Sequence, residues 1–257
     1  MIVSANPMVV KAIKTRKFLP PKDDLWDLLS EIKSLKENSV VALTSKVVSI
    51  GEGRCIPIEK FPNKDELVIK ETDKYLPRDA TPYGLVMHTI KNNIFTASAG
   101  IDESNGAGYY ILWPKNPKSS AKKIWQFLSK KFKLNNLGVI ITDSRLVPFR
   151  RGVVGIVLSF FGFKPLRDYR GKKDIFGREL TMETSNLPDS LATAAVLEMG
   201  EGSEQSPMSI ITDIPYIKFT SKDIDEFEIP SKEDIFYPLF SKVKWKKGGS
   251  GKKGFRV

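Results

Sequence analysis

The segment Gly100–Pro114, GIDESNGAGYYILWP, decides which class of sheet the chain forms. Asn105-Gly106 is a strong signal for a tight turn between two antiparallel strands. The apolar stretches on either side, NNIFTASAG (92–100) and YYILWP (109–114), are predicted to be those strands. A purely parallel sheet has no such hairpin. Because helices also alternate with strands along the chain, we predict a mixed α/β protein with partly antiparallel sheets.

The same segment gathers four consecutive side chains that carry oxygen, at positions 102–105. Turn chemistry explains such a cluster, because Asp and Asn side chains on loops commonly accept hydrogen bonds from nearby backbone amides. Metal or nucleotide binding is the alternative. The segment alone leaves both interpretations of Asp102 and Asn105 open.

A second pair of polar residues favours the metal interpretation. The apolar stretch LGVIITDS, Leu137–Ser144, is predicted to be a buried strand that ends in Asp143 and Ser144. Strand ends are where ligands bind in many sheet proteins, although a terminal Asp also serves as a cap. Asp102 and Asp143 are predicted to converge on one divalent cation, with the Ser144 hydroxyl available to a second.

The remaining pattern places helices and strands around these two segments. We predict a strand near 9–13, a helix within 20–38 capped by Asp23, and a buried strand over 40–54 that contains Lys46. A second helix is predicted to be capped by Ser119 or Ser120. Further elements are a strand from 153, an Ala-rich helix over 188–199 that ends at Gly200, and a strand over 207–215.

Charge is distributed unevenly. The net charge of the 257-residue chain is +11, and SKVKWKKGGSGKKGFRV, residues 241–257, holds seven Lys or Arg and no acid. The rest of the chain carries 34 basic and 30 acidic residues, a net of +4. We predict one domain of two lobes over 1–240 and a tail, 241–257, without fixed structure. The tail either contacts a polyanion such as RNA or only aids solubility. The second reading is preferred, so nucleic acid is not an expected partner.

Several common chemistries are excluded by residue counts. Cys55 is the only cysteine and His88 the only histidine, so neither an internal disulfide nor a metal site of several Cys or His ligands can form. His88 lies among apolar neighbours and is expected to be a packed residue and not a catalyst. No G-x-x-x-x-G-K-[ST] or G-x-G-x-x-G motif occurs. A metal would need oxygen ligands, which suits Mg²⁺ or Mn²⁺. The longest apolar run, 153–163, is too short to span a membrane, and no signal peptide is recognised, so a cytoplasmic location is expected.

Two further segments have both a structural and a functional interpretation. PLRDYRGKKDIFGREL, 165–180, is either a solvated charged loop or a site for carboxylate or phosphate, for which arginine forks are suited. GEGSEQSP, 200–207, is either a surface turn or a loop whose amides face a nucleotide.

In order, these segments resemble the coenzyme F-420 γ-glutamyl ligase family. The resemblance covers about 40–212 and is carried by the following pieces, in the family's order and approximate spacing: VVALTSKVVSIGEGR, SAGIDESN, LWPKNPKSSAKKI, GVIITDSRLVPFRRG, GFKPLRDYRGKKDIFGREL and DSLATAAVLEMGEGSEQSP. It implies a mixed α/β fold distinct from Mur-type ligases and P-loop proteins. It also implies a homodimer that uses GTP with two divalent ions.

The resemblance also implies roles for individual residues. Asp102 and Asp143 would bind one ion and Ser144 the other. The nucleotide would be bound by Lys46, Asn105, Gly200, Glu201, Gly202, Ser203, Glu204 and Gln205. Catalytic roles are expected for Lys46, Arg150 and Arg170. Binding of the acceptor and glutamate is expected for Arg151, Arg167, Asp168 and Arg178.

The reaction implied is attack of an acceptor carboxylate on the γ-phosphate of GTP or ATP, followed by displacement of phosphate by the amine of L-glutamate. Two departures from the family pattern concern the acceptor: Val154-Gly155 replaces a Thr-Asp pair, and Glu103 replaces a basic residue. The acceptor is therefore expected to be pterin-like, either the deazaflavin precursor or, slightly favoured, folate. The alternatives are an RNA-binding protein and a catalytically inactive relative.

Overall fold

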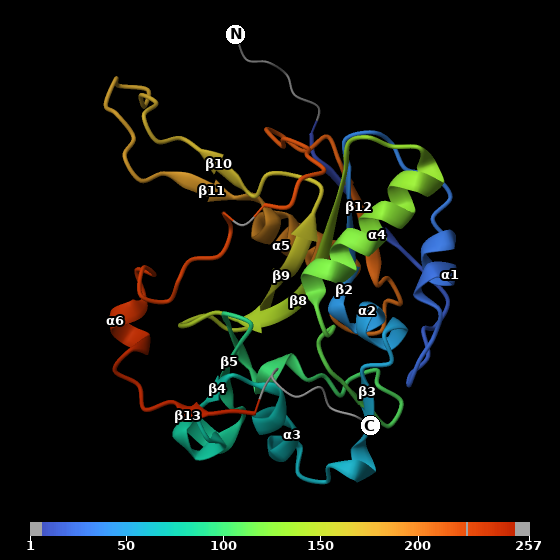
Figure 1. Cartoon of the computed structure of the whole chain (residues 1–257), viewed down its shortest axis with the longest axis vertical. Coiled ribbons are helices and arrows are strands. Elements are labelled where there is room, and N and C mark those ends of the chain that lie inside the picture. The colour runs from blue at the N-terminus through green and yellow to red at the C-terminus, as the bar shows by residue number, and fades with distance from the viewer. Residues whose placement is uncertain (1–6, 225, 250–257) are drawn as a thin grey trace.

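The structure is a computed structural model that describes residues 7–224 and 226–249 (Figure 1). Its α-helices are α1 (Leu25–Ser30), α2 (Ser45–Gly51), α3 (Lys64–Glu71), α4 (Pro117–Phe132), α5 (Leu187–Met199) and α6 (Tyr237–Phe240). Its strands are β1 (Val9–Ile13), β2 (Ser39–Thr44), β3 (Cys55–Pro57), β4 (Lys74–Tyr75), β5 (His88–Lys91), β6 (Ile94–Ala97), β7 (Tyr109–Ile111), β8 (Leu137–Leu146), β9 (Val153–Phe161), β10 (Leu166–Asp168), β11 (Thr184–Asn186), β12 (Met208–Thr212) and β13 (Lys246–Lys247). None of the helices in the described ranges is long and apolar enough to cross a membrane.

The largest sheet has five strands in the order β1-β12-β2-β8-β9. Only β2 and β8 run parallel, and the other neighbouring pairs are antiparallel. The prediction of a mixed α/β fold with partly antiparallel sheets is therefore confirmed. Parallel pairing has one consequence for function, because it brings the carboxyl ends of β2 and β8 to the same edge of the sheet.

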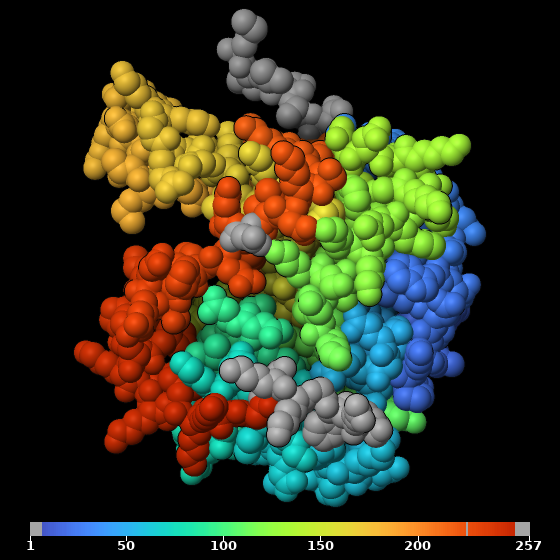
Figure 2. Space-filling view, in the orientation of Figure 1, coloured from blue at the N-terminus to red at the C-terminus, as the bar shows by residue number. Residues whose placement is uncertain are grey.

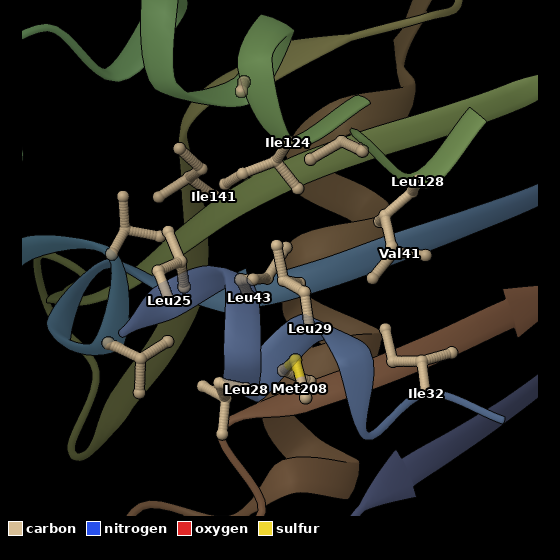
Figure 3. Close-up of a cluster of buried hydrophobic side chains, with 14 of the residues drawn as sticks. Leu25, Leu28, Leu29, Ile32, Val41, Leu43, Ile124, Leu128, Ile141 and Met208 are labelled. Carbon is tan, nitrogen blue, oxygen red and sulfur yellow. The ribbon is translucent and has the colours of Figure 1, made fainter. Parts of the chain in front are cut away.

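Both faces of this sheet are covered by helices. One cluster of buried side chains joins α1 and α4 to the sheet, and Figure 3 shows Leu29 of α1 and Leu128 of α4 gathered in it with Val41 of β2. The other cluster joins the opposite face to α5 through Leu191 and Ala195. Strands buried on both faces need apolar residues at successive positions, which explains the continuous run VVAL at 40–43.

Three smaller sheets complete the fold. They are β13-β4-β5-β6, the pair β3-β7, and the pair β10-β11. A separate apolar cluster that includes Leu67, Met87 and Tyr110 packs beside the first two. The β10-β11 arm, residues 163–186, projects away from the main sheet, as Figures 1 and 2 show. The division of 1–240 into two lobes stays a prediction.

The predicted hairpin around Asn105 is only partly correct. The chain does reverse there, with an isolated antiparallel bridge between Asp102 and Ile111. However, β6 pairs with β5 and β7 pairs with β3, so the two flanking strands belong to different sheets. The reason is that residues 98–100 form a short 3-10 turn, which redirects the chain before the bridge.

Several predicted helix boundaries are wrong. Lys46 lies in the first turn of α2 and not inside a strand, because β2 already ends at Thr44. The cap of α1 is Asp24, since Asp23 instead binds Arg16 at 2.7 Å. Asn116 caps α4, in place of Ser119 or Ser120.

The first predicted helix is also shorter than expected. It ends at Ser30, and the ammonium of Lys131 on α4 donates hydrogen bonds to the carbonyl oxygens of Ser30 at 2.8 Å and of Ile32 at 3.1 Å. These carbonyls therefore have partners without a further helical turn. Ile32 is buried as the helical pattern predicted, although it lies outside the helix.

The prediction of an unstructured tail is wrong for residues 241–249. β13 pairs with β4, and Trp245 lies against Phe95 and Phe240 with ring centroids 6.4 Å apart in each pair. The apolar ring and the paired backbone explain why this basic segment docks. The rest of the predicted tail, 250–257, lies outside the described residues.

Candidate functional site

A cavity of about 810 Å³ opens at the carboxyl ends of β2 and β8. The register of the two strands pairs Thr44 with Thr142. Lys46 comes two residues after Thr44 and Asp143 directly after Thr142, so both lie at the same edge of the sheet. Other walls come from the loop after residue 100, the segment 15–20 and the loop 200–207. Strand ends at such an edge are a common place for ligand binding.

Lys46 and Asp102 form an ion pair on the cavity wall. The Lys46 Nζ lies 2.6 Å from Asp102 Oδ2 and also donates to the carbonyl oxygen of Ser104 at 2.9 Å. The other carboxylate oxygen of Asp102 accepts from the backbone amides of Glu103 and Ser104. Burial would raise the pKa of Asp102, but the bonds from Lys46 and Ser104 outweigh it and the pKa is lowered. Asp102 is therefore ionised at neutral pH.

Asp143 has a different environment. Its Oδ2 accepts a hydrogen bond from the indole Nε1 of Trp113. Burial raises the pKa of Asp143 to about 6, and the nearby charge of Asp102 acts in the same direction, while Trp113 and Lys46 oppose the rise. Asp102 and Asp143 both line the cavity, so the structure brings the predicted pair to one site.

Two hydrogen bonds connect these segments to the loop 200–207. The Ser144 hydroxyl donates to Glu201 Oε1 at 2.7 Å, and the Asn105 side chain donates to the carbonyl oxygen of Gly202 at 3.0 Å. The loop is also attached to the segment 15–20, since the amide of Thr15 donates to the carbonyl oxygen of Gln205. Four parts of the chain that are distant in sequence thus form one polar wall.

All residues predicted to bind nucleotide line this cavity. They are Lys46, Asn105, Gly200, Glu201, Gly202, Ser203, Glu204 and Gln205. Within the loop, the carboxylate of Glu204 accepts from the amide of Gly202 at 2.8 Å. The loop is therefore folded on itself as well as facing the cavity, so the turn interpretation and the binding interpretation are both compatible with it.

The oxygen donors at the cavity fit a hard divalent cation. Asp102, Asp143 and Ser144 contribute two carboxylates and a hydroxyl, and Mg²⁺ and Mn²⁺ prefer oxygen ligands. No cluster of three or more His, Cys, Asp or Glu side chains suited to a metal occurs within the described ranges. This set suits Mg²⁺ bound by one or two carboxylates together with water and substrate phosphates, and not a closed protein cage.

The predicted arginines do not line the cavity. Arg150 and Arg151 are exposed in the β8–β9 connection, whereas the neighbouring positions Arg145, Leu146 and Val153 do reach it. Their predicted roles stay predictions. The side chain of Arg150 donates to the carbonyl oxygen of Phe149, so it is held next to the turn.

The remaining candidates for acceptor and glutamate binding belong to the β10-β11 arm. Asp168 and Arg170 bind one another at 2.7 Å on the exposed arm, and Arg178 is also exposed. The guanidinium of Arg167 stacks on Tyr216, with its carbon 3.1 Å from the ring centroid. In this chain the arm residues form a charged surface of their own, separate from the residues that line the cavity.

Sequence reasoning missed two features of the site. Trp113 contacts Asp143, yet an aromatic residue in LWP reads as core. Phe18, Leu19 and Pro20 in the cavity lining lie at or just before the start of the first predicted helix and carried no motif. A tryptophan at the end of a strand that follows a cluster of acidic residues was the available signal for Trp113.

The fold and site together define a mixed α/β protein with a polar cavity at the carboxyl ends of its parallel strands, where a lysine and two aspartates converge. The model of the family described as F420-0:Gamma-glutamyl ligase matches residues 13–213. Coenzyme F420:L-glutamate ligase of Methanopyrus kandleri is 31% identical over an alignment of 240 residues that covers 87% of this chain and 91% of that protein.

Two other relatives agree with this match. Coenzyme F420:L-glutamate ligase of Methanocaldococcus jannaschii is 30% identical over 217 residues, 79% of this chain and 86% of that protein. The protein of the same name from Archaeoglobus fulgidus is 32% identical over 206 residues, 74% of this chain and 81% of that protein. The chain belongs to the F420-0:γ-glutamyl ligase family, and the predicted resemblance is confirmed. It is thus a member of a family of amide-forming ligases.

Proposed function

We propose that the protein is a γ-glutamyl ligase that depends on a nucleotide and a divalent metal. It adds L-glutamate to the terminal carboxylate of a pterin-type acceptor, either the F420 precursor or folate. One observation carries the proposal: Lys46, Asp102, Asp143 and Ser144 meet at one cavity inside the part of the chain that the family model matches.

The nucleotide is GTP or ATP. A volume of about 810 Å³ lies within the range of small-molecule sites. Lys46 offers a positive charge to a phosphate, and Asn105 and the loop 200–205 offer polar groups on the same wall. The apolar side formed by Phe18 and Leu19 supplies a surface for a base. A lining that contains both charged and apolar side chains supports a triphosphate nucleotide as the ligand.

The reaction proceeds through an acyl phosphate. A carboxylate oxygen of the acceptor attacks the γ-phosphorus, and the bond to the β-phosphate oxygen breaks, releasing the nucleoside diphosphate. The glutamate amine then attacks the acyl carbon. The bond to the phosphate oxygen breaks, phosphate leaves, and the amine loses a proton as the amide forms.

The residues of the chain contribute mainly charge and position. Lys46 stabilises negative charge that develops during phosphoryl transfer, in a site where water is partly excluded. Asp102, Asp143 and Ser144 would hold Mg²⁺ or Mn²⁺, in up to two sites. When bound, the metal supplies further neutralisation of the phosphate oxygens. Orientation of acceptor and nucleotide in one cavity accounts for much of the remaining lowering of the barrier.

The choice of acceptor depends on the surroundings of β9. The departure at Val154-Gly155 has a structural explanation at Gly155, where an added Cβ would lie 2.5 Å from the carbonyl oxygen of Ala192 on α5. Thr193 also donates to the carbonyl oxygen of Gly155. The departure therefore has a packing reason, and the names of the relatives make the F420 precursor the first acceptor to test.

The test is incubation with labelled L-glutamate, GTP or ATP, Mg²⁺ or Mn²⁺, and a panel of deazaflavin and folate acceptors, followed by mass spectrometry. We expect one acceptor to gain glutamyl residues, and Asp143→Asn to abolish the gain. Asp79→Asn, at an exposed position that does not line the cavity, is the matched control and keeps activity. Nucleotide binding without turnover on any acceptor would favour an inactive relative, and full activity of Asp143→Asn would overturn the proposed site.

A homodimer is part of the proposal. Large apolar side chains are exposed in the β8–β9 connection and on the arm: Phe149 at 99%, Ile175 at 91% and Phe176 at 89%. Side chains of this kind are covered in most stable assemblies. Light scattering should give twice the monomer mass, and a monomeric mass at micromolar concentration would contradict a dimer.

A further inference from the structure

The indole of Trp113 lies behind the cavity and contacts Asp143 directly. Trp113 is only 1% exposed, and its Nε1 donates to Asp143 Oδ2. A buried indole N–H normally has a hydrogen-bond partner. Here that partner is the Asp143 carboxylate, which the proposed function assigns to metal binding. Trp113 therefore contacts the proposed metal site in addition to packing in the core.

The same indole edge supports the segment that carries Asp102. Gly100 has a φ of +67°, and a Cβ added to it would lie 2.0 Å from Trp113 Nε1. The backbone of residue 100 therefore rests against the indole, two residues before Asp102. Trp113 is in contact with both segments whose carboxylates meet at the cavity.

Charged side chains hold Trp113 from behind. Glu71 Oε2 accepts from Arg54 Nη2 at 2.7 Å and from Lys91 Nζ at 3.0 Å. Arg54 Nε donates to the carbonyl oxygen of Trp113 at 3.2 Å, and Lys91 Nζ lies 5.5 Å from the centroid of its ring. The side chains of Lys91 and Glu71 are 8% and 12% exposed.

Such a network is unusual for a tryptophan that only fills space. Buried charges lose hydration, and an apolar set of similar volume is often equally stable, so their presence calls for another role. Arg54 holds the Trp113 carbonyl oxygen and Lys91 lies over the indole ring, while Glu71 binds both cations and keeps them in place. A fixed ring in turn fixes the direction of its N–H toward Asp143.

We propose that Trp113 is a positioning residue that orients the Asp143 carboxylate for metal binding, and that Arg54, Glu71 and Lys91 hold its indole in place. This proposal rests on the proposed function, because it gives a role to a residue acting through Asp143. Groups that orient a ligand carboxylate by hydrogen bonding typically change metal affinity by about 10- to 100-fold when they are removed.

The experiment compares Trp113→Phe with Trp125→Phe. Both replacements keep an aromatic ring and remove one indole hydrogen bond, since Trp125 Nε1 donates to the carbonyl oxygen of Leu137 at 2.8 Å. Trp125 packs against Phe161, away from the residues that line the cavity. Mn²⁺ binding is measured by calorimetry and by electron paramagnetic resonance, with and without GTP, and thermal unfolding is recorded for each variant.

We expect Trp113→Phe to raise the dissociation constant of Mn²⁺ about 10- to 100-fold, while Trp125→Phe leaves it within about 2-fold. Equal Mn²⁺ affinity in wild type and Trp113→Phe would overturn the positioning role and leave the proposed function intact. Absence of Mn²⁺ binding by the wild type, with or without GTP, would overturn the metal-dependent function and the positioning role together.

A second measurement keeps the proposal falsifiable if Trp113→Phe does not fold. The chain has four tryptophans, so the Trp113 indole resonance can be assigned by replacing the other three one at a time. In the wild type, saturating Mg²⁺ should shift the Trp113 indole N–H resonance and leave that of Trp125 unchanged. An unmoved Trp113 resonance, under conditions where Mg²⁺ binding is seen by calorimetry, would overturn the positioning role.

Discussion

The ammonium of Lys46 lies 2.6 Å from Asp102 Oδ2, so a helix that follows β2 is linked directly to the loop that precedes β7. The ammonium balances a carboxylate whose pKa is lowered, after the opposing effect of burial, by this same contact. A ligand phosphate or a metal cation at Asp102 would therefore act on an existing ion pair. Lys46 and Asp102 are expected to respond together to ligands and to substitutions.

Replacement of Lys46 tests this link. We expect Lys46→Gln to reduce kcat/KM for the nucleotide by roughly 10²-fold, because one positive charge near the phosphates is lost. The matched control is Lys64→Gln. Lys64 forms an ion pair with Glu103 at 3.2 Å on the same loop but does not line the cavity. Steady-state kinetics distinguish the two variants. A similar loss for both would indicate a general effect on the loop and not a role in catalysis.

Two glycines with positive φ separate steric from backbone effects. Gly100→Ala would place a Cβ 2.0 Å from Trp113 Nε1, whereas Gly152→Ala, with a φ of +88°, would meet no heavy atom within 4 Å. We expect Gly152→Ala to lower the free energy of unfolding by about 1 to 2 kcal/mol. Gly100→Ala should cost more and weaken Mn²⁺ binding as well. Urea unfolding measures the free energy of unfolding of both variants. An equal loss of stability in Gly100→Ala and Gly152→Ala would contradict the close packing of residue 100 against Trp113.

The buried pair of Glu71 and Lys91 predicts a pH dependence of stability. Burial alone would raise the pKa of Glu71, but the charges of Lys91 and Arg54 outweigh it and the folded-state pKa is lowered. The unfolded value is about 4.3. A lowered folded pKa contributes stability that is complete above about pH 4.3 and is lost as the pH falls through the folded value.

Glu71→Gln should therefore destabilise the protein by about 3 kcal/mol at pH 7, because it leaves buried Lys91 without its carboxylate. The difference from the wild type should shrink as the pH falls below about 4. Glu66→Gln, an exposed position on the same helix, is the control and should show little change at any pH. Urea unfolding between pH 3 and pH 7 provides the measurement. A difference that does not depend on pH would refute the assigned ionisation of Glu71.

The docked segment 241–249 gives a prediction about truncation. Removal of 241–257 should lower the Tm by several degrees, since the contacts of Trp245 with Phe95 and Phe240 and the pairing of β13 are lost. Removal of 250–257 alone is the control. Filter binding with labelled RNA at low and high salt tests the RNA alternative on the same proteins. Salt-dependent binding that disappears on removal of 241–257 would support the alternative.

The sequence was most informative where one pattern required one structure. The predicted strands 40–54 and 137–144 correspond to β2 and β8, whose continuous apolar runs suit strands buried on both faces, although β2 already ends at Thr44. Their parallel pairing then brings Lys46 and Asp143 to the same edge. The mixed α/β class was predicted correctly from the alternation of helices and strands, although the hairpin expected at Asn105-Gly106 does not pair β6 with β7.

Other features depended on contacts between distant residues. The sequence near Ile32 does not indicate that Lys131, on another helix, donates hydrogen bonds to the carbonyl oxygens that follow α1. β7 pairs with β3 and not with β6, because the 3-10 turn at 98–100 redirects the chain between them. No residue pattern indicates this turn. Likewise no local pattern around Trp113 indicates its hydrogen bond to Asp143, because that carboxylate lies on another strand.

The hydrogen bonds from Ser144 to Glu201 and from Asn105 to Gly202 affect the affinity of any ligand that binds in the cavity. A molecule that recruits the Ser144 hydroxyl or the Asn105 amide must first separate them from these internal acceptors. The net gain is then an exchange of one hydrogen bond for another, typically only about 1 kcal/mol each. Measured ligand affinities should therefore be lower than the number of hydrogen bonds in the complex would suggest. Product release should be correspondingly fast.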